Sequence, residues 1–268
     1  MPLEFHQVDA FTDQPFAGNP AMVYRLDAWL DEPLMQRIAA EHNLAETAFV
    51  VKEGEVWHIR WFTPTSEVPL CGHATLASAK VLFDLYHEAG DVLQFTCKSG
   101  ALRVTRQGER LELDFPVRPV GPVAASLQAD VERALGQPAQ QVLALLNADG
   151  SVQELMAVLA SEAQVRGFTP DLPALAALPG LGVLVTGAGE RHDFVSRYFA
   201  PAIGIAEDPV TGSTHCMLVP YWSERLGRTE LNAFQCSARG GELLCRLDGS
   251  RVKIAGHARH IASGQLML

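Results

Sequence analysis

The chain has 268 residues, of which 48% are apolar, and a formal net charge of −10 at pH 7. This length and apolar content allow one large domain or two smaller ones with a sizeable core. The acidic balance, with Lys and Arg scattered, excludes a nucleic-acid-binding surface, which needs clustered basic residues. No apolar run reaches the roughly 18 residues of a membrane span, so no membrane partner is expected.

The five cysteines are odd in number and show no CxxC spacing. The N-terminal letters MPLEFHQVDAF contain acidic residues and no basic segment ahead of an apolar block, unlike a secretory signal. We therefore expect free thiols and a cytoplasmic location.

The first half of the chain alternates between helix and strand patterns. Residues 31–44 predict a helix with Asp31 as N-cap and Asn43 near its end. Residues 47–53 and 56–62 predict a β-hairpin. Residues 74–86 are apolar on most faces and predict a buried helix, and residues 91–116 predict three strands.

Residues 117–125 contain two prolines and a glycine and predict a linker between two domains. We expect the first domain at 1–117, completed by a C-terminal strand near 257–268, and the second domain at 118–256. The patterns predicted for the second domain are a helix at 126–136, a short helix after Pro170, and strands at 141–150, 153–161, 182–189, 193–201 and within 230–249.

Two short motifs recur in both halves. The letters RWFTP (60–64) match RYFAP (197–201) in Arg, Phe and Pro. The letters VPLCGHAT (68–75) match DPVTGSTH (208–215) in Pro and Gly. Each half shows the same order of strand, F-x-P, loop, P-x-x-G and apolar helix. This shared order favours a duplicated α+β domain over chance similarity.

The repeated glycines stand directly before the two apolar helices. The first N–H groups of a helix are unpaired and carry partial positive charge, so such an end can bind a carboxylate. We expect Gly72 with His73, and Gly212 with Ser213, to grip a small anion. The alternative interpretation is that both are simple helix starts, with Ser213 as an N-cap.

Two acidic residues lie near these glycines but outside the repeat. Glu46 begins an apolar strand, and Asp208 precedes a proline. A Glu, a His and an Asp that converge on two helix N-termini would form an acid/base site for a carboxylate. The alternatives are an exposed Glu at a strand edge and an Asp-Pro turn. His257 and His260 have no Cys or carboxylate nearby, so we expect no metal site.

The motifs together resemble the PhzF-like phenazine-biosynthesis isomerase family. The resemblance lies in residues 9–23, 44–50, 62–82, 193–201 and 207–216. It implies the diaminopimelate epimerase-like fold, in which two pseudo-symmetric α+β domains each wrap a curled, mostly antiparallel sheet around a central helix. The central helices would be 73–86 and 213–226. The resemblance also implies a homodimer.

The resemblance further implies the roles of single residues. Glu46 falls on the catalytic glutamate, and His73 and Asp208 fall on other catalytic positions. Gly72, Gly212, Ser213 and Asn19 would bind a small carboxylate substrate, although Asn19 could instead only make a turn. The best-known member isomerises a dihydro-hydroxyanthranilate by moving a proton, without a cofactor or a metal.

Two other functions stay open. Related racemases use two cysteines as opposed bases, but the residue that matches Cys71 in the repeat is Thr211. A variant that uses Cys71 alone is one alternative. The other is a non-catalytic protein that binds small anions on the same fold.

Overall fold

The computed structural model describes residues 2–268, which form two compact units. Unit 1 extends to Phe115 and includes Lys253–Leu268, and unit 2 is Pro116–Val252. The sequence predicts these divisions at 117/118 and 256/257, a few residues further along the chain. Among the residues described, no helix is both long and apolar enough to cross a membrane.

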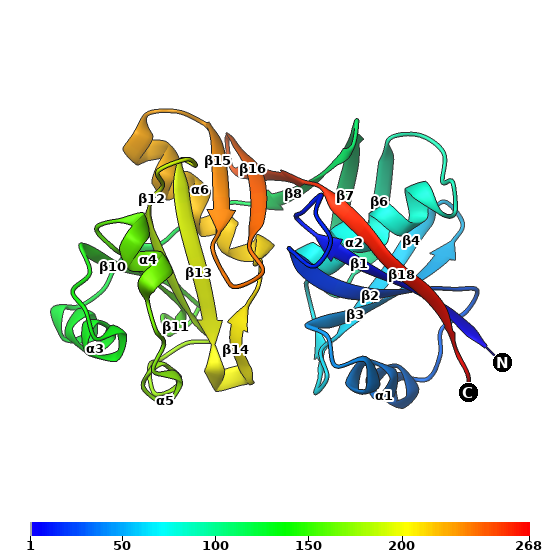
Figure 1. The fold of residues 1–268 in the computed structure, drawn as a ribbon, viewed down its shortest axis with the longest axis horizontal. Coiled ribbons are helices and arrows are strands. Elements are labelled where there is room, and N and C mark those ends of the chain that lie inside the picture. Colours follow the sequence, from blue (N-terminus) through cyan, green and yellow to red (C-terminus); the bar gives the residue numbers. More distant parts are fainter. Residues whose placement is uncertain (1) are drawn as a thin grey trace. The chain divides into compact units, whose positions relative to one another are not determined.

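Unit 1 is a mixed sheet with one helix in its curve (Figure 1). The strand order is β18–β1–β2–β3–β4–β6–β7–β8, with β5 beside β4. Only the pairs β2/β3 and β4/β6 are parallel among these. The strands are β1 (Leu3–Ala10), β2 (Asn19–Leu26), β3 (Glu46–Glu53), β4 (Val56–Phe62), β5 (Glu67–Val68), β6 (Val92–Cys97), β7 (Gly100–Gln107), β8 (Arg110–Pro116) and β18 (Ala258–Leu266).

The central helix of unit 1 is α2 (Gly72–Asp84), and its apolar sequence explains its position. All but two of its residues are buried, and it packs against β1, β2, β3 and β18. The helix α1 (Glu32–His42) covers the opposite side of the sheet. It begins after Asp31 and ends at Asn43, whose φ of 50° places it in the left-handed region. Both ends were predicted from the sequence.

The strands of unit 2 also pair in a mixed arrangement. The strand order is β9–β10–β11–β12–β13–β15–β16, with β14 beside β13. The pairs β11/β12 and β13/β15 are parallel. The strands are β9 (Gly121–Pro122), β10 (Gln141–Leu146), β11 (Val152–Val158), β12 (Val183–Ala188), β13 (Phe194–Ala200), β14 (Ile205–Asp208), β15 (Glu230–Gln235) and β16 (Gly241–Asp248). The strand β17 (Arg251–Gly256) crosses the division between the units.

The central helix of unit 2 is α6 (Gly212–Leu226), which continues across Pro220. Trp222 anchors it, because its indole N–H donates to Thr186 Oγ1 at 3.0 Å and its ring stacks on Phe194. The other face of the sheet holds a second apolar core under α3 (Ala125–Leu135), α4 (Glu162–Gly167) and α5 (Leu172–Ala176). A short 3₁₀ turn, η1 (Pro201–Ile203), follows β13.

The two units have the same topology. Seven successive strands of each sheet follow one another with the same sequence of antiparallel and parallel pairs, and the short strands β5 and β14 occupy equivalent positions. The predicted pseudo-symmetric α+β fold is therefore confirmed.

Several local predictions need correction. Residues 117–125 are not only a linker, because Gly121 and Pro122 form β9 and pair with β10. The helix α4 was not predicted. Each central helix begins one residue earlier than predicted, at its glycine.

Candidate active site

The start of α2 brings together most of the residues predicted for unit 1. Cys71 is the N-cap residue, with an extended backbone, and its side chain makes no capping bond. Gly72 and His73 are therefore the first two helical residues, where backbone N–H groups have no partner within the helix. A Thr75 Oγ1–H bond of 2.5 Å to the Cys71 carbonyl ties this turn together.

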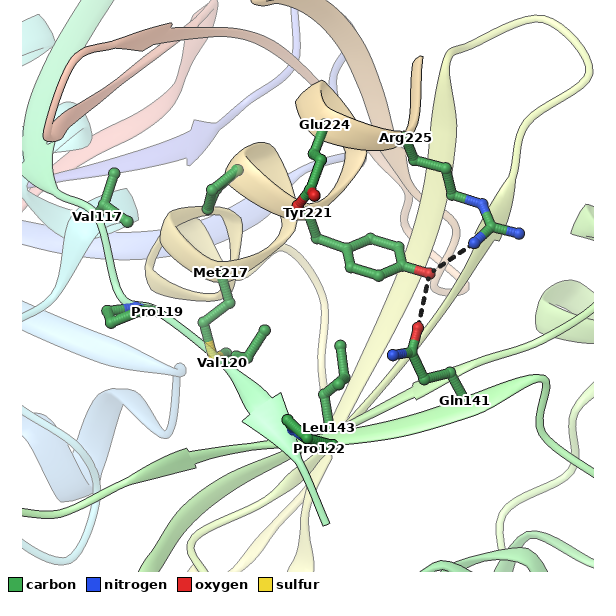
Figure 2. A pocket seen from close by; sticks show the side chains of 11 residues that line it. Val117, Pro119, Val120, Pro122, Gln141, Leu143, Met217, Tyr221, Glu224 and Arg225 are labelled. Atoms are coloured by element: carbon green, nitrogen blue, oxygen red, sulfur yellow. Dashed lines mark hydrogen bonds between the residues drawn. The ribbon is translucent and has the colours of Figure 1, made fainter. Parts of the chain in front are cut away.

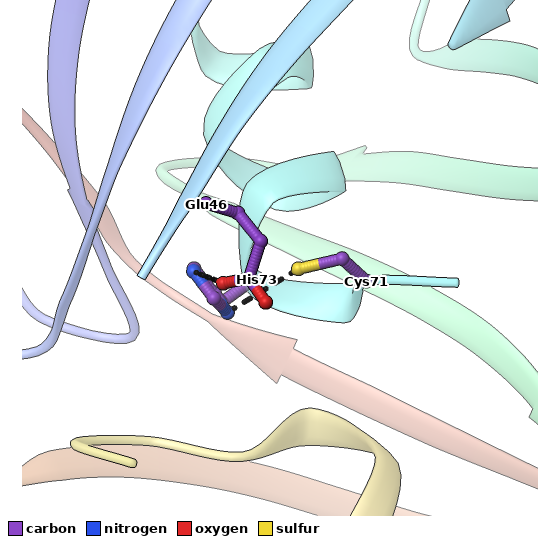
Figure 3. Close-up of side chains that lie close together, drawn as sticks. All are labelled: Glu46, Cys71 and His73. Atoms are coloured by element: carbon purple, nitrogen blue, oxygen red, sulfur yellow. Dashed lines mark hydrogen bonds and ion pairs between the residues drawn. The ribbon is translucent and has the colours of Figure 1, made fainter. Parts of the chain in front are cut away.

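His73 lies at the centre of a cluster of polar side chains (Figure 3). Its Nε2 lies 3.1 Å from Glu46 Oε2, and its Nδ1 lies 3.2 Å from the side-chain nitrogen of Asn19 and 3.5 Å from Cys71 Sγ. The side chain of His73 is 5% exposed and that of Glu46 is 12% exposed. Glu46 is the first residue of β3, so its predicted position at a strand start is confirmed.

Burial and neighbouring charge act in opposite directions on His73. Burial lowers its pKa, but the adjacent Cys71 and Glu46 raise it, and the net result is a pKa well above the ordinary value. Burial, together with the Glu46 carboxylate, raises the pKa of Cys71 to about 11. The thiol is therefore neutral at pH 7, and the carboxylate of Glu46 is the charge that favours protonated His73.

The start of α6 brings together the residues predicted for unit 2. Thr211, not Ser213, is the N-cap residue, which corrects one alternative interpretation of Ser213. Gly212 and Ser213 are the first two helical residues, and Ser213 is half-buried. The carboxylate of Asp208 accepts a 2.6 Å hydrogen bond from Thr211 Oγ1. Asp208 is thus held against the turn that leads into the helix.

Gln235 is a residue of this site that sequence reasoning missed. Its amide nitrogen donates to the Asp208 carbonyl at 2.7 Å, and its amide oxygen accepts from the Thr211 backbone N–H at 2.8 Å. It is fully buried at the end of β15. The signal in the sequence was a glutamine at an inward position of an alternating strand, after Leu231 and Ala233.

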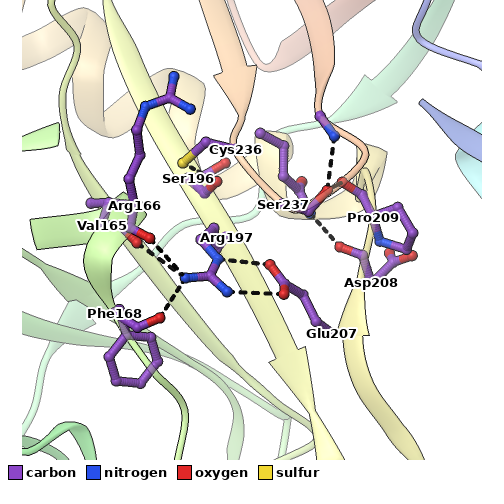
Figure 4. Close-up of polar contacts among 12 residues, drawn as sticks. Val165, Arg166, Phe168, Ser196, Arg197, Glu207, Asp208, Pro209, Cys236 and Ser237 are labelled. Carbon is purple, nitrogen blue, oxygen red and sulfur yellow. Dashed lines mark hydrogen bonds and ion pairs between the residues drawn. The ribbon is translucent and has the colours of Figure 1, made fainter. Parts of the chain in front are cut away.

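An arginine and a glutamate clamp each of the two loops that lead to the helices. In unit 2, Arg197 donates to both oxygens of Glu207, at 2.7 and 2.9 Å (Figure 4). In unit 1, Arg60 donates to both oxygens of Glu67, at 2.8 and 2.7 Å. Both arginines belong to the repeated R-x-F-x-P motif, and both glutamates immediately precede the second motif. The pairing of these residues was not predicted.

Unit 2 also contains a buried carboxyl group that sequence reasoning missed. Glu154 is 7% exposed, and its Oε2 accepts a 2.9 Å hydrogen bond from the hydroxyl of Tyr198. Burial raises the pKa of Glu154 to about 7, although Tyr198 and Arg118 act in the opposite direction. Tyr198 is also the strand partner of Asp208. The buried carboxyl group of Glu154 and the predicted acid Asp208 therefore have Tyr198 as a common neighbour.

A hollow on unit 2 lies away from these residues (Figure 2). It has a volume of about 660 Å³, between α6 and the segment around β9. Tyr221 lies in it, with its hydroxyl near Gln141 and Arg225. None of the residues predicted for the site lines it.

Asn19, Glu46, Gly72 and His73 therefore meet in unit 1, while Asp208, Gly212 and Ser213 meet in unit 2. That the two groups act on one substrate stays a prediction.

Comparison with known proteins identifies the family. The family model described as phenazine biosynthesis-like protein matches residues 8–264. The chain belongs to the phenazine biosynthesis-like (PhzF) family. Within this family it is 60% identical to an uncharacterized isomerase of Pseudomonas aeruginosa, over the full length of both chains. The crystal structure of a PhzF-family protein from Enterococcus faecalis has 47% sequence identity and a TM-score of 0.92, with full coverage of both chains.

The same fold occurs in more distant proteins. A hydroxyproline epimerase from Agrobacterium vitis has only 10% sequence identity but a TM-score of 0.61, with 99% of this chain and 92% of that chain covered. This likeness shows a shared epimerase-like fold. At the level of the family, the chain is thus a PhzF-like isomerase.

Proposed function

We propose that this PhzF-family chain is a cofactor-independent isomerase that moves a proton between two carbons of a small carboxylate-bearing substrate, with Glu46 as the acid/base. The observation that carries the proposal is the buried contact of 3.1 Å between Glu46 Oε2 and His73 Nε2. A carboxylate with one oxygen held by a histidine is positioned for proton transfer.

The proposed reaction has two steps. First, the carboxylate of Glu46 takes a proton from a substrate carbon next to a conjugated or carbonyl system, and the electron pair of the broken C–H bond moves into that system. Glu46 then returns the proton to a different carbon of the same conjugated system. Glu46 Oε1 suits this role, since Oε2 is the oxygen that contacts His73.

His73 and Asn19 would control the charge next to Glu46. When protonated, His73 places a positive charge beside the carboxylate of Glu46 before the first step. The amide of Asn19 can present either its nitrogen or its oxygen to His73 Nδ1, so it can accompany both the neutral and the protonated ring. Asn19 is therefore proposed to hold the histidine in place as the proton moves.

The helix starts would bind the substrate. Gly72 and His73 in unit 1, and Gly212 and Ser213 in unit 2, begin helices whose first N–H groups suit a carboxylate. Asp208 would accept a hydrogen bond from a substrate hydroxyl or amine. A site shared by both units, a homodimer and a cytoplasmic location stay predictions.

One observation bears on the cysteine alternative. A base must lose its proton near the working pH, but the Cys71 thiol has a pKa of about 11 because it is buried and faces Glu46. Cys71 is accordingly a poor base at neutral pH, and Glu46 is the better candidate.

The test is hydrogen exchange with solvent. The protein is incubated in D₂O with dihydro-hydroxyanthranilate and with a panel of small cyclic and acyclic carboxylic acids, and carbon-bound deuterium is read by mass spectrometry. We expect deuterium in at least one compound with the wild type and a loss of about 10³-fold or more in Glu46→Gln.

A matched control is Glu53→Gln, at the exposed end of the same strand. This variant should exchange deuterium like the wild type. Substrate binding by Glu46→Gln, measured by thermal shift, should persist. Binding without any exchange by the wild type would instead support the non-catalytic anion-binding protein.

A further inference from the structure

Three side chains in unit 1 present one metal-binding atom each to a common point. Glu46 comes from the start of β3, Cys71 from the residue before α2, and His73 from the first turn of α2 (Figure 3). A carboxylate oxygen, the thiol sulfur and a ring nitrogen all lie within 4.8 Å of one another. Together they form a cluster of three different donor types from the start of β3 and the start of α2.

The donor set determines which ions suit it. Sulfur, imidazole nitrogen and a single carboxylate oxygen are ligands of Zn²⁺ and similar ions, whereas Ca²⁺ and Mg²⁺ require mostly oxygen. Zinc bonds of about 2.0 to 2.3 Å in a tetrahedron place neighbouring ligand atoms about 3.3 to 3.8 Å apart. The separation of Cys71 Sγ and His73 Nδ1 is 3.5 Å, and a carboxylate oxygen of Glu46 lies within 4.8 Å of the sulfur and the ring nitrogen.

The surroundings favour a fixed geometry. The hydroxyl of Thr75 holds the carbonyl of Cys71. Such outer contacts orient metal ligands. Cys71 and His73 are buried, but Glu46 is partly exposed, which leaves a side from which an ion and a fourth ligand such as water can enter. Three protein ligands and one open position are typical of an accessible zinc site.

The repeat provides an internal comparison. The residues that match Glu46, Cys71 and His73 in unit 2 are Val183, Thr211 and Ser213. Valine cannot bind a metal, and the two hydroxyls are weak ligands for Zn²⁺. The ligand set is thus a property of unit 1 alone, although both units share the same helix start.

We propose that Glu46, Cys71 and His73 form a site for a zinc-like divalent cation, and that an ion bound there blocks proton transfer by Glu46. On binding, the ion forms bonds to the sulfur, to one ring nitrogen and to a carboxylate oxygen. The proton of the thiol and the extra proton of the His73 ring are both released to the buffer, so that His73 binds as the neutral ring. The ion would therefore inhibit the protein reversibly by occupying both the base and its neighbour. Metal binding itself does not depend on the proposed reaction.

The test is a titration of the purified, chelator-treated full chain with Co²⁺, without substrate. We expect one Co²⁺ per chain, a thiolate-to-cobalt charge-transfer band in the near ultraviolet, and loss of this band when Zn²⁺ displaces Co²⁺. Cys71→Ser and Cys71→Ala should lose the band and bind Zn²⁺ at least about 100-fold more weakly. Circular dichroism checks that both variants fold.

The matched control is Cys97→Ser, which removes the half-buried thiol of β6 and should leave the band intact. The proposal is overturned if the wild type shows no thiolate-to-cobalt band, or if both Cys71 variants bind as tightly as the wild type. Because no substrate is present, either failure leaves the proposed isomerase unaffected. Conversely, a chain that binds Zn²⁺ but exchanges no deuterium keeps this proposal and loses the catalytic one.

Discussion

The two central helices begin with the same backbone arrangement and different chemistry. In unit 1, Thr75 donates to the carbonyl of Cys71 at 2.5 Å. In unit 2, His215 stands at the matching position and its Nδ1 contacts the carbonyl of Thr211 at 2.9 Å. In each unit a side chain contacts the backbone carbonyl four residues before it in the chain. That side chain is a threonine in unit 1 and a histidine in unit 2. The first turn of each helix is therefore a shared framework on which side chains differ.

Each helix start contains one buried histidine, and their charges differ. Burial lowers the pKa of His215 to about 4, although the backbone carbonyl of Thr211 acts in the opposite direction. His73 is just as deeply buried, but beside Glu46 its pKa lies well above the ordinary value. Burial alone therefore makes a neutral, structural histidine, and only the added carboxylate turns it into a group suited to proton chemistry.

We expect the largest difference in unfolding free energy between variants of the two arginine–glutamate pairs, Arg197 with Glu207 and Arg60 with Glu67. Arg197 is 11% exposed and binds Glu207 and the carbonyl of Phe168, at 2.6 Å. Arg197→Met would leave the partly buried Glu207 and the Phe168 carbonyl without this partner, which costs about 3 to 4 kcal/mol of unfolding free energy. Arg60 is 23% exposed, and its partner Glu67 also pairs with Lys98. Arg60→Met should therefore cost only about 1 to 2 kcal/mol.

Denaturant unfolding of both variants, with hydrogen exchange measured separately in the two units, checks this prediction. The loss in Arg197→Met should be concentrated in unit 2. Equal losses of unfolding free energy in the two variants would show that the two arginine–glutamate pairs contribute equally to stability.

The next prediction is that protonation of His215 makes the free energy of unfolding depend on pH. An unfolded histidine has a pKa of 6.5, and the folded value is about 4, so the unfolded state binds more protons between these values. The stabilisation is present above pH 6.5 and is lost as the pH falls toward 4. Over this range we expect a loss of about 3 kcal/mol from this group.

His215→Thr copies the residue of unit 1 and removes the titrating ring while it keeps a hydroxyl for the Thr211 carbonyl. Unfolding free energies of the wild type and the variant are compared at pH 7 and pH 4. The cost of the lost packing is the same at both pH values, so only the difference between them counts. The variant should lose about 3 kcal/mol less than the wild type on acidification. Equal losses would mean that His215 is protonated in the folded protein.

Much of this framework could be predicted from the sequence. The repeated Arg, Phe, Pro and Gly mark the two helix starts because these residues recur with the same order of elements. Glu46 was predictable as a candidate because it begins an apolar strand, its repeat partner is Val183, and the family resemblance places the catalytic glutamate on it.

The remaining features depend on contacts that no local pattern encodes. Gln235 reaches Thr211 from a strand 24 positions later. Glu154 and Tyr198 meet across the sheet, 44 positions apart. The strand β9 has only two residues, Gly121 and Pro122, and exists because β10 lies beside it. Propensity and periodicity describe neighbours in sequence, and these pairs become neighbours only after the sheet forms.

The smallest effect that we predict concerns the hydrogen bond between Thr211 and the carboxylate of Asp208 in unit 2. Thr211 donates to the Asp208 carboxylate at 2.6 Å, whereas the matching Cys71 contacts a histidine. Thr211→Val keeps the shape and removes the hydroxyl. A hydrogen bond to a charged group contributes about 1.5 to 3 kcal/mol, so the unfolding free energy should fall by about 2 kcal/mol.

Thr65→Val, in an exposed loop of unit 1, is the control and should change stability by less than about 0.5 kcal/mol. If Thr211→Val is no more destabilising than this control, then the framework around Gln235 positions Asp208 without the hydroxyl. In that case the two helix starts differ in their side chains but not in what holds them. If the loss is as large as expected, each unit secures its acidic residue by its own means: a threonine hydroxyl for Asp208, and a histidine ring for Glu46.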